Sequence, residues 1–129
     1  MVDVLAPISV GELIDKITIL RIKADKIRAA AAHKNVSDEL ARLMQIRTGL
    51  ELTVDLRGLE EQLLEVNLRL WSVEDDLRDL ERRRDFGERF VELARSVYAL
   101  NDRRAALKRE ISTVTSSSII DEKSYQPYQ

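Results

Sequence analysis

Hydrophobic residues recur at helical spacing along most of the chain, and the most regular run lies in its second half. Between residues 56 and 80 they return in steps of three and four without a gap, at Leu56, Leu59, Leu63, Val66, Leu70, Val73, Leu77 and Leu80. A second run in the same rhythm covers residues 86–114, at Phe86, Phe90, Leu93, Val97, Leu100, Leu107, Ile111 and Val114. The connection around Arg82–Asp85 is short, so the pattern predicts two long antiparallel helices that form a hairpin.

The first half predicts two more helices. Ser9 and Glu12 form a capping-box pattern at the start of a helix that we expect to run from Ser9 to Ala32. A second helix is expected from Asn35 or Ser37, with Val36, Leu40, Leu43, Met44, Ile46 and Leu50 on its buried side. A loop or kink is expected near residues 49–55, where glycine, threonine and aspartate weaken helix. The predicted fold is therefore all-α and similar to a four-helix bundle, in a single domain of residues 1–129.

The tail of the chain, residues 116–129, changes character. It combines four serines and a proline with Ile119, Ile120, Tyr125 and Tyr128. Paired tyrosines and isoleucines give such a segment apolar surface to bury. We therefore expect an extended C-terminal tail that docks on the helices.

Composition narrows the choice of partners. The chain has a formal net charge of −2, so nucleic acid is not an expected partner. It has no cysteine, and His33 is its only histidine, so we expect no metal site and no cofactor. No segment is apolar enough to span a membrane, and the start lacks the pattern of a signal peptide, so we expect a cytoplasmic protein.

A cluster of polar residues interrupts the last apolar run. Arg104 stands where a hydrophobic residue is due, and Asn101 and Lys108 lie one helical turn to either side. In one interpretation, Asn101 and Arg104 fix the register of the hairpin, and Arg104 pairs with Glu60 of the preceding helix. In the other, Arg104 and Lys108 face a groove together with Lys16 or Lys123 and bind an anionic group.

Other polar and aromatic residues join the candidates. Asn67, Trp71 and Glu74 follow one stripe of the long helix before the turn, although a tryptophan there is more typical of a packing anchor and Glu74 of a solvated face. The candidate binding residues are Lys16, Asn67, Trp71, Glu74, Asn101, Arg104, Lys108, Lys123 and Tyr125. No catalytic residue follows from the sequence.

Three segments, GELIDKITIL, FVELARSVYALNDRRAALKREI and EKSYQPY, resemble a family of small all-helical bacterial and phage proteins of unknown function. The resemblance extends from Ile8 to Tyr128. It implies an association with surface polysaccharide assembly or glycosyltransferases, and it brings no catalytic residues with it. A fainter likeness, through residues 13–17 and 20–21 of the first helix, is to the helical chorismate mutases. That likeness implies Arg and Lys side chains that bind a dianionic substrate, although residues 6–12 contain no basic residue.

Two functions remain open at this point. The first helix is apolar on more than one side, and the helices are longer than a compact bundle of this mass requires, so we expect a homodimer. The first hypothesis is a dimeric interaction module that also binds a second protein. The alternative is a small enzyme or binding protein for an anionic metabolite.

Overall fold

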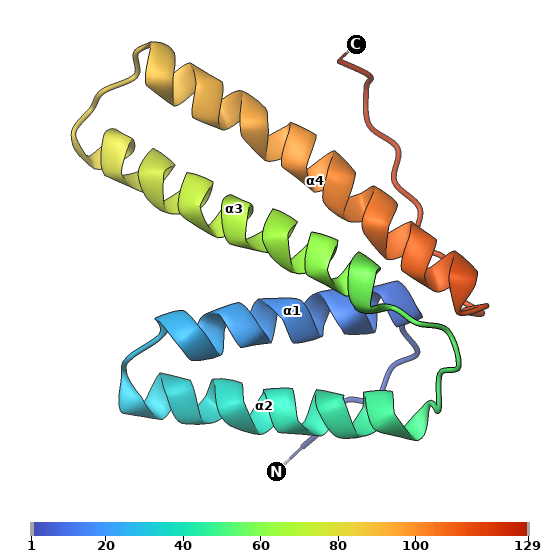
Figure 1. Ribbon diagram of the computed structural model, residues 1–129. Coiled ribbons are helices and arrows are strands. Elements are labelled where there is room, and N and C mark those ends of the chain that lie inside the picture. The colour runs from blue at the N-terminus through green and yellow to red at the C-terminus, as the bar shows by residue number, and fades with distance from the viewer. Residues whose placement is uncertain (1, 129) are drawn as a thin grey trace.

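The chain folds into two helical hairpins. The computed structural model describes residues 2–128, and within them lie α1 (Val10–Lys26), α2 (Ala30–Gly49), α3 (Arg57–Arg82) and α4 (Glu88–Val114), with no strand. Figure 1 shows the α3–α4 hairpin stacked on the α1–α2 hairpin, with the C-terminal residues running back beside α4. This arrangement confirms the all-α fold and the long hairpin that the two hydrophobic runs predict.

The turn between α3 and α4 is closed by backbone hydrogen bonds. Arg84 adopts a left-handed conformation (φ 54°) after the last turn of α3. This conformation lets the amide of Asp85 donate to the carbonyl of Leu80 at 2.9 Å, which is the Schellman arrangement. Helix α4 then begins at Glu88 with Gly87 as its N-cap, two residues after the start of the hydrophobic run at Phe86. Phe86 therefore lies outside the helix and is half exposed, so its predicted place in the seam is wrong.

The first helix ends earlier in the structure than the sequence predicts. Helix α1 stops at Lys26, and residues 27–29 form a tight connection before α2 begins at Ala30. The expected continuous helix to Ala32 is therefore wrong. His33 lies in α2, and its Nε2 atom is 3.0 Å from the carbonyl oxygen of Ala24. This contact helps to hold the two helices in an antiparallel hairpin.

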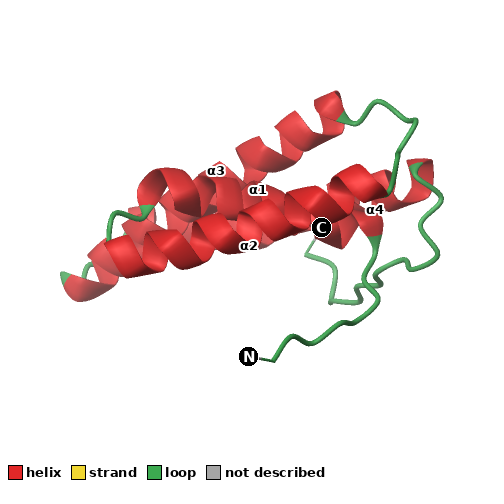
Figure 2. Cartoon of the chain, turned by 90° about the horizontal axis from the view of Figure 1, so that it is seen from below, coloured by secondary structure: helices red, strands yellow, loops and turns green. Residues whose placement is uncertain are grey.

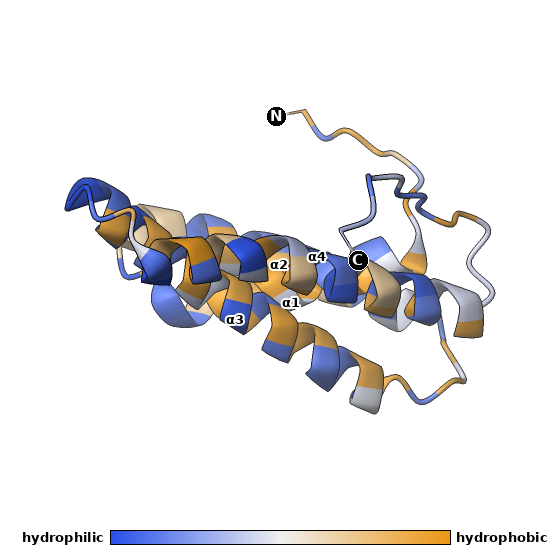
Figure 3. Cartoon of the chain, turned by 90° about the horizontal axis from the view of Figure 1, so that it is seen from above, coloured by the Kyte–Doolittle hydropathy of each residue, from blue (hydrophilic) through white to orange (hydrophobic). Residues whose placement is uncertain are grey.

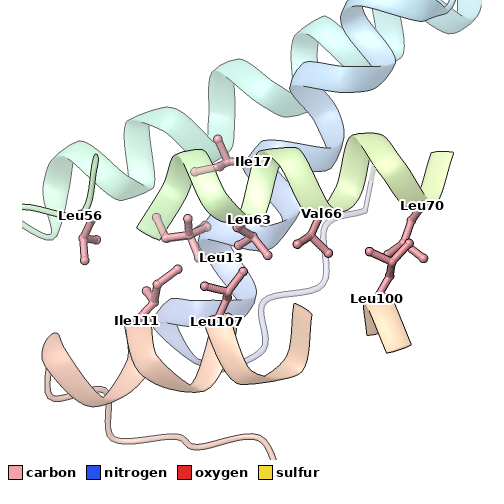
Figure 4. Close-up of a cluster of buried hydrophobic side chains, with 10 residues drawn as sticks. Leu13, Ile17, Leu56, Leu63, Val66, Leu70, Leu100, Leu107 and Ile111 are labelled. Carbon is pink, nitrogen blue, oxygen red and sulfur yellow. The ribbon is translucent and has the colours of Figure 1, made fainter. Parts of the chain in front are cut away.

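Helix α1 is the centre of the fold, because it packs against α2, α3 and α4. The core lies between α1 and the α3–α4 hairpin, as Figure 4 shows. Its buried members are Leu13, Ile14 and Ile17 of α1, Leu56, Leu63, Val66 and Leu70 from α3 and its start, and Leu100, Leu107 and Ile111 of α4. Burying these aliphatic side chains supplies most of the free energy that holds the three helices together.

Helix α2 is an outer layer. Among the four helices of residues 10–114, its backbone lies close to that of α1 alone, and the Arg47–Glu60 ion pair joins it to α3. Figure 2 shows it lying across the face of the bundle that is nearest the viewer. Val36 is buried, whereas Met44, Ile46 and Leu50 are 41%, 53% and 44% exposed. Their predicted burial within one chain is therefore wrong, because no second helix covers that side. Figure 3 shows a mostly hydrophobic N-terminal segment running away from the helices.

Candidate functional site

A buried carboxylate occupies the middle of the bundle. Asp15 is fully buried on α1, on a stretch that otherwise points isoleucine and leucine into the core. Its Oδ1 atom accepts a hydrogen bond from Nδ2 of Asn67 at 3.0 Å, and the same amide nitrogen is 2.9 Å from the hydroxyl of Thr18. The Thr18 hydroxyl donates to the backbone carbonyl of Asp15 at 2.7 Å. These bonds replace the water that the carboxylate loses on folding.

The main partner of Asp15 is Arg104. Nε and Nη2 of Arg104 donate to the two carboxylate oxygens at 2.9 and 2.5 Å. A bidentate pair of this kind fixes the plane of the guanidinium as well as its position. The hydrogen bonds to Asp15 raise the pKa of Arg104 above its usual range, which burial opposes, and the charges of Asp15 and Glu12 add to the rise. Since the raised pKa lies above an already alkaline value, Arg104 remains protonated throughout the neutral and acidic range.

This geometry corrects the predicted pairing of Arg104 with Glu60. Glu60 instead forms an ion pair with Arg47 at the end of α2. The predicted pairing involved only the two helices of the α3–α4 hairpin, but the partner of Arg104 comes from α1. Asp15 carried a signal that the sequence analysis did not use, since it is a charged residue between Leu13, Ile14 and Ile17, just as Arg104 interrupts its own apolar run.

A second ion pair lies one turn away. Nζ of Lys108 is 2.5 Å from the Oε2 atom of Glu12 and 3.9 Å from the Oδ2 atom of Asp15. The helices can come this close because Gly11 has no side chain. A Cβ atom at Gly11 would lie 2.1 Å from the carbonyl oxygen of Lys108, well inside the distance that real atoms tolerate. The crossing of α1 and α4 at this glycine thus sets the position of both ion pairs.

Hydroxyl groups complete the crossing. The first backbone amides of α1 have no partner within the helix. Here the amide of Glu12 donates to the Oγ atom of Ser9, that of Gly11 to Ser112, and that of Val10 to Ser117, at 3.0, 2.9 and 3.1 Å. Ser9 in turn donates to the carboxylate of Asp121 at 2.6 Å. Residues at the end of α4 and beyond it therefore cap the start of α1.

The segment after α4, residues 116–128, is called the C-terminal segment below. It turns back because Ser116 takes a left-handed conformation (φ 55°), which allows the amide of Ser117 to donate to the carbonyl of Ser112 at 2.8 Å. Further along, Arg109 pairs with Glu122 at 3.1 Å, and Lys123 pairs with Asp102 at 2.7 Å. These contacts hold the segment beside the outer face of α4, as Figure 1 shows.

A cavity of about 700 Å³ lies between α4 and the C-terminal segment. We call it the α4 cavity. From α4 it is lined by Tyr98, Asn101, Asp102, Arg104 and Lys108, and from the C-terminal segment by Lys123, Tyr125, Gln126 and Tyr128, with Val97 and Ala105 completing the wall. Its size is in the range of cavities that hold small-molecule ligands.

The cationic groups of the α4 cavity keep unused hydrogen-bond donors. A guanidinium has five N–H groups and an ammonium has three. Arg104 donates through Nε and Nη2 to Asp15, and in the described part of the chain its Nη1 atom donates to no protein group. Lys108 donates to Glu12, and Glu12 and Asp15 are not among the residues that line the cavity. The cavity wall is thus positively charged around Arg104, Lys108 and Lys123, with Asp102 as its carboxylate.

The structure brings together five of the residues proposed from the sequence. Asn101, Arg104, Lys108, Lys123 and Tyr125 line the α4 cavity. Asn67 lies behind them as a hydrogen-bond partner of Asp15.

The remaining candidates lie elsewhere. Lys16 lines a separate depression of about 230 Å³ that Arg104 also borders. Trp71 is half-buried on α3, and Glu74 pairs with Arg78 at 2.7 Å; neither is among the residues of the α4 cavity. Sequence reasoning did not single out Asp15, Tyr98, Asp102 or Gln126 as parts of a site. Tyr98 lies three residues before Asn101 and four before Asp102, and that helical spacing was the available signal.

Two classes of feature are absent from residues 2–128. None of the helices there combines the length and hydrophobicity that crossing a lipid bilayer requires. Those residues also bring together no group of three or more acidic or histidine side chains in a position to hold a metal ion.

Comparison with known proteins places the chain in a family. The model of a family of unknown function, DUF6165, matches residues 4–128. The chain belongs to this family. Membership in DUF6165 confirms the resemblance drawn from the three sequence segments, and the match includes both the α4 cavity and the whole C-terminal segment. Neither the curated proteins nor the solved structures gave a match.

Proposed function

We propose that the protein binds a small anionic ligand in the α4 cavity. The observation that carries this proposal is the guanidinium of Arg104, which borders the cavity while the buried Asp15 holds it by two hydrogen bonds. Lys108 and Lys123 stand beside it on the same cavity. Cationic donors that are fixed before binding lose little conformational entropy when an anion arrives, which favours affinity.

The internal ion pairs balance the charges of Arg104, Lys108 and Lys123, but they leave hydrogen-bond donors on the cavity side. Asp15 accepts hydrogen bonds from the inner edge of Arg104, and its carboxylate lies in the core rather than on the cavity wall. An anion on the cavity side would meet the unused Nη1 donors of Arg104 and the remaining hydrogens of the Lys108 ammonium. Charge-assisted hydrogen bonds of this type are about twice as strong as neutral ones.

Isothermal titration calorimetry with pyrophosphate, a compact anion, tests the proposal. We expect saturable binding to the wild-type protein and at least a tenfold loss of affinity in Lys108→Gln. Lys34→Gln on α2 is the matched control, since Lys34 is a solvated lysine paired with Asp38 far from the cavity lining. It should bind as the wild type does. No binding to the wild type, or equal losses in the two variants, would refute the proposal.

The same preparation separates a binding protein from an enzyme. The likeness to helical chorismate mutases makes chorismate a second probe, because its two carboxylates would need several cationic partners. Turnover of chorismate would assign a mutase-like activity to the chain. Saturable binding without turnover supports the role of a binding protein that we propose.

We also propose that the protein acts as a homodimer. The chain exposes 9254 Å², whereas a compact monomer of 14.8 kDa is expected to expose about 7000 Å². The excess is larger than the roughly 800 Å² that each partner buries in a standard interface. Part of it is apolar, because Met44, Ile46 and Leu50 of α2 and Leu5 and Ile8 of the N-terminal segment are exposed. A second copy that covers this side of α2 would complete the outer layer.

Light scattering tests the dimer directly. At micromolar concentration we expect twice the mass of one chain, and Ile46→Glu should shift the protein to the monomer while Gln45→Glu should not. A wild-type mass of 14.8 kDa would refute the dimer.

The family resemblance also implies an association with polysaccharide assembly. Co-purification from native cells tests it, and the association requires that a protein of that machinery is recovered.

A further inference from the structure

We infer that the ligand of the α4 cavity is a nucleoside diphosphate, or a close relative with the same order of parts: an anionic group, a hydroxylated sugar and a flat ring. This inference rests on the proposed anion binding and adds to it the chemistry of the rest of the ligand. It follows from the order in which different side chains occur along the cavity.

The cavity is elongated and its two ends differ. Along α4 its wall extends from Val97 and Tyr98 to Lys108. The ten steps along the helix from Tyr98 to Lys108 cover about 15 Å at the standard rise per residue. Arg104 and Lys108 make one end cationic, and the tyrosines make the other end aromatic. A compact anion such as phosphate would fill only one part of this length.

The aromatic end offers flat surfaces for stacking. The rings of Tyr98 and Tyr128 lie 4.6 Å apart between centroids and join α4 to the C-terminal segment. Tyr125, which also lines the cavity, is 79% exposed. Nζ of Lys123 lies 5.1 Å from the centroid of the Tyr125 ring. Stacking of a nucleobase on an aromatic side chain is favourable and requires no particular base.

The direction of the ligand is fixed by Asp102, which lies between Tyr98 and Lys108 along the α4 wall of the cavity. Asp102 lines it and accepts a hydrogen bond from Lys123 at 2.7 Å, while Asn101 and Gln126 supply amide donors and acceptors. A carboxylate repels phosphate but accepts hydrogen bonds from hydroxyl groups. The anionic group is thereby directed to Arg104 and Lys108, and a sugar hydroxyl to Asp102. A base attached to that sugar then reaches the tyrosines.

A comparison of affinities tests the inference. We would titrate the wild type with pyrophosphate, glucose 1-phosphate, ADP and UDP under identical conditions. We expect ADP and UDP to bind at least tenfold more tightly than pyrophosphate, and glucose 1-phosphate to fall below both nucleotides. Two nucleotides are used because stacking on tyrosine should accept either base.

Two variants locate the ring. Tyr125→Leu, at an exposed position, should remove most of the tenfold advantage of the nucleotides and leave pyrophosphate affinity within twofold of wild type. Tyr125→Phe keeps the ring and should retain that advantage. Tyr98→Leu should also reduce the advantage of the nucleotides over pyrophosphate. The affinity of this variant for pyrophosphate shows whether the cationic end of the cavity is still intact.

The outcomes separate the two proposals. If pyrophosphate binds and the nucleotides bind no more tightly, the inference fails while the proposed anion binding stands. If glucose 1-phosphate binds as tightly as ADP and UDP, the flat ring is not recognised and the inference also fails. If none of the four compounds binds, both proposals fail.

Discussion

The two sides of α1 are built differently. The side that faces α3, α4 and the C-terminal segment carries the buried Asp15, two ion pairs and the close contact at Gly11. The side that faces α2 is an aliphatic contact with one helix, whose own outer residues Met44 and Ile46 are half exposed. On the first side, a small displacement would leave a buried charge without its partner. On the second, it would cost only some apolar area.

This difference shows which part of the molecule has a fixed geometry. Across the described residues, every buried side-chain nitrogen or oxygen has a hydrogen-bond partner. A fully paired buried network favours one arrangement of its helices over others, although it adds little net stability compared with an apolar core. The α4 cavity lies against this part of the fold. Helix α2 lies outside it and is available for contact with another chain.

The largest effect is expected at Asp15. Asp15→Ala leaves the partly buried Arg104 guanidinium without its carboxylate and removes one of the two acceptors of the Asn67 amide, so we expect a loss of about 3–5 kcal/mol in the free energy of unfolding. Urea denaturation at one fixed protein concentration measures it. Asp38→Ala on α2, which removes a solvated carboxylate paired with Lys34, should leave the midpoint nearly unchanged.

The double variant Asp15→Leu with Arg104→Met sharpens this test. It removes both charges at once, so it should lose less stability than Asp15→Ala. If Asp15→Ala costs no more than Asp38→Ala, the buried network does not distinguish the two sides of α1.

The next effect concerns the close contact of α1 with α4. Gly11→Ala places a Cβ atom against the backbone of Lys108, and a backbone cannot move aside as a side chain can. We expect a loss of about 1–3 kcal/mol from the forced separation of the helices. Gly49→Ala at the end of α2 is the control, since nothing lies within 4 Å of a Cβ atom there. Alanine favours helix over glycine, so this control should be neutral or slightly stabilising.

The smallest predicted loss of stability comes from removing a hydroxyl group, and it should differ between Ser112 and Thr48. Ser112→Ala leaves the buried amide of Gly11 without an acceptor, and we expect a loss of about 1–2 kcal/mol in urea denaturation. Thr48→Ala removes a hydroxyl that bonds to the exposed carbonyl of Met44 on α2. Water can replace that bond, so the control should lie within about 0.5 kcal/mol of wild type. Equal losses in the two variants would contradict the account of the helix start.

Much of the fold follows from local signals in the sequence. The regular seam of α3 and the short turn predict the hairpin, and the Ser9 cap is found where its pattern places it. The break at residues 27–29 could not be predicted, because neither glycine nor proline marks it. It forms because the apolar side of α2 gains a surface on α1 when the chain turns back, and that gain depends on tertiary packing.

Only part of the candidate site could be predicted from the sequence. Arg104 was identified because it is a charged residue within an apolar run, and the same property would have identified Asp15. Which carboxylate pairs with Arg104 depends on how α1 crosses the hairpin, and the spacing along one helix does not contain that information. The cavity itself needs the C-terminal segment. Its course is set by hydrogen bonds of Ser117 and Asp121 with the start of α1 and by ion pairs of Glu122 and Lys123 with α4.

Hydrogen–deuterium exchange with and without saturating pyrophosphate tests the central claim, which is that the fixed side of the molecule serves an anionic ligand. We predict slower exchange at the C-terminal part of α4, residues 97–108, and in residues 123–128, with unchanged exchange along α2. Slower exchange confined to α2, or no change in residues 97–108 at a concentration that saturates binding, would contradict the account.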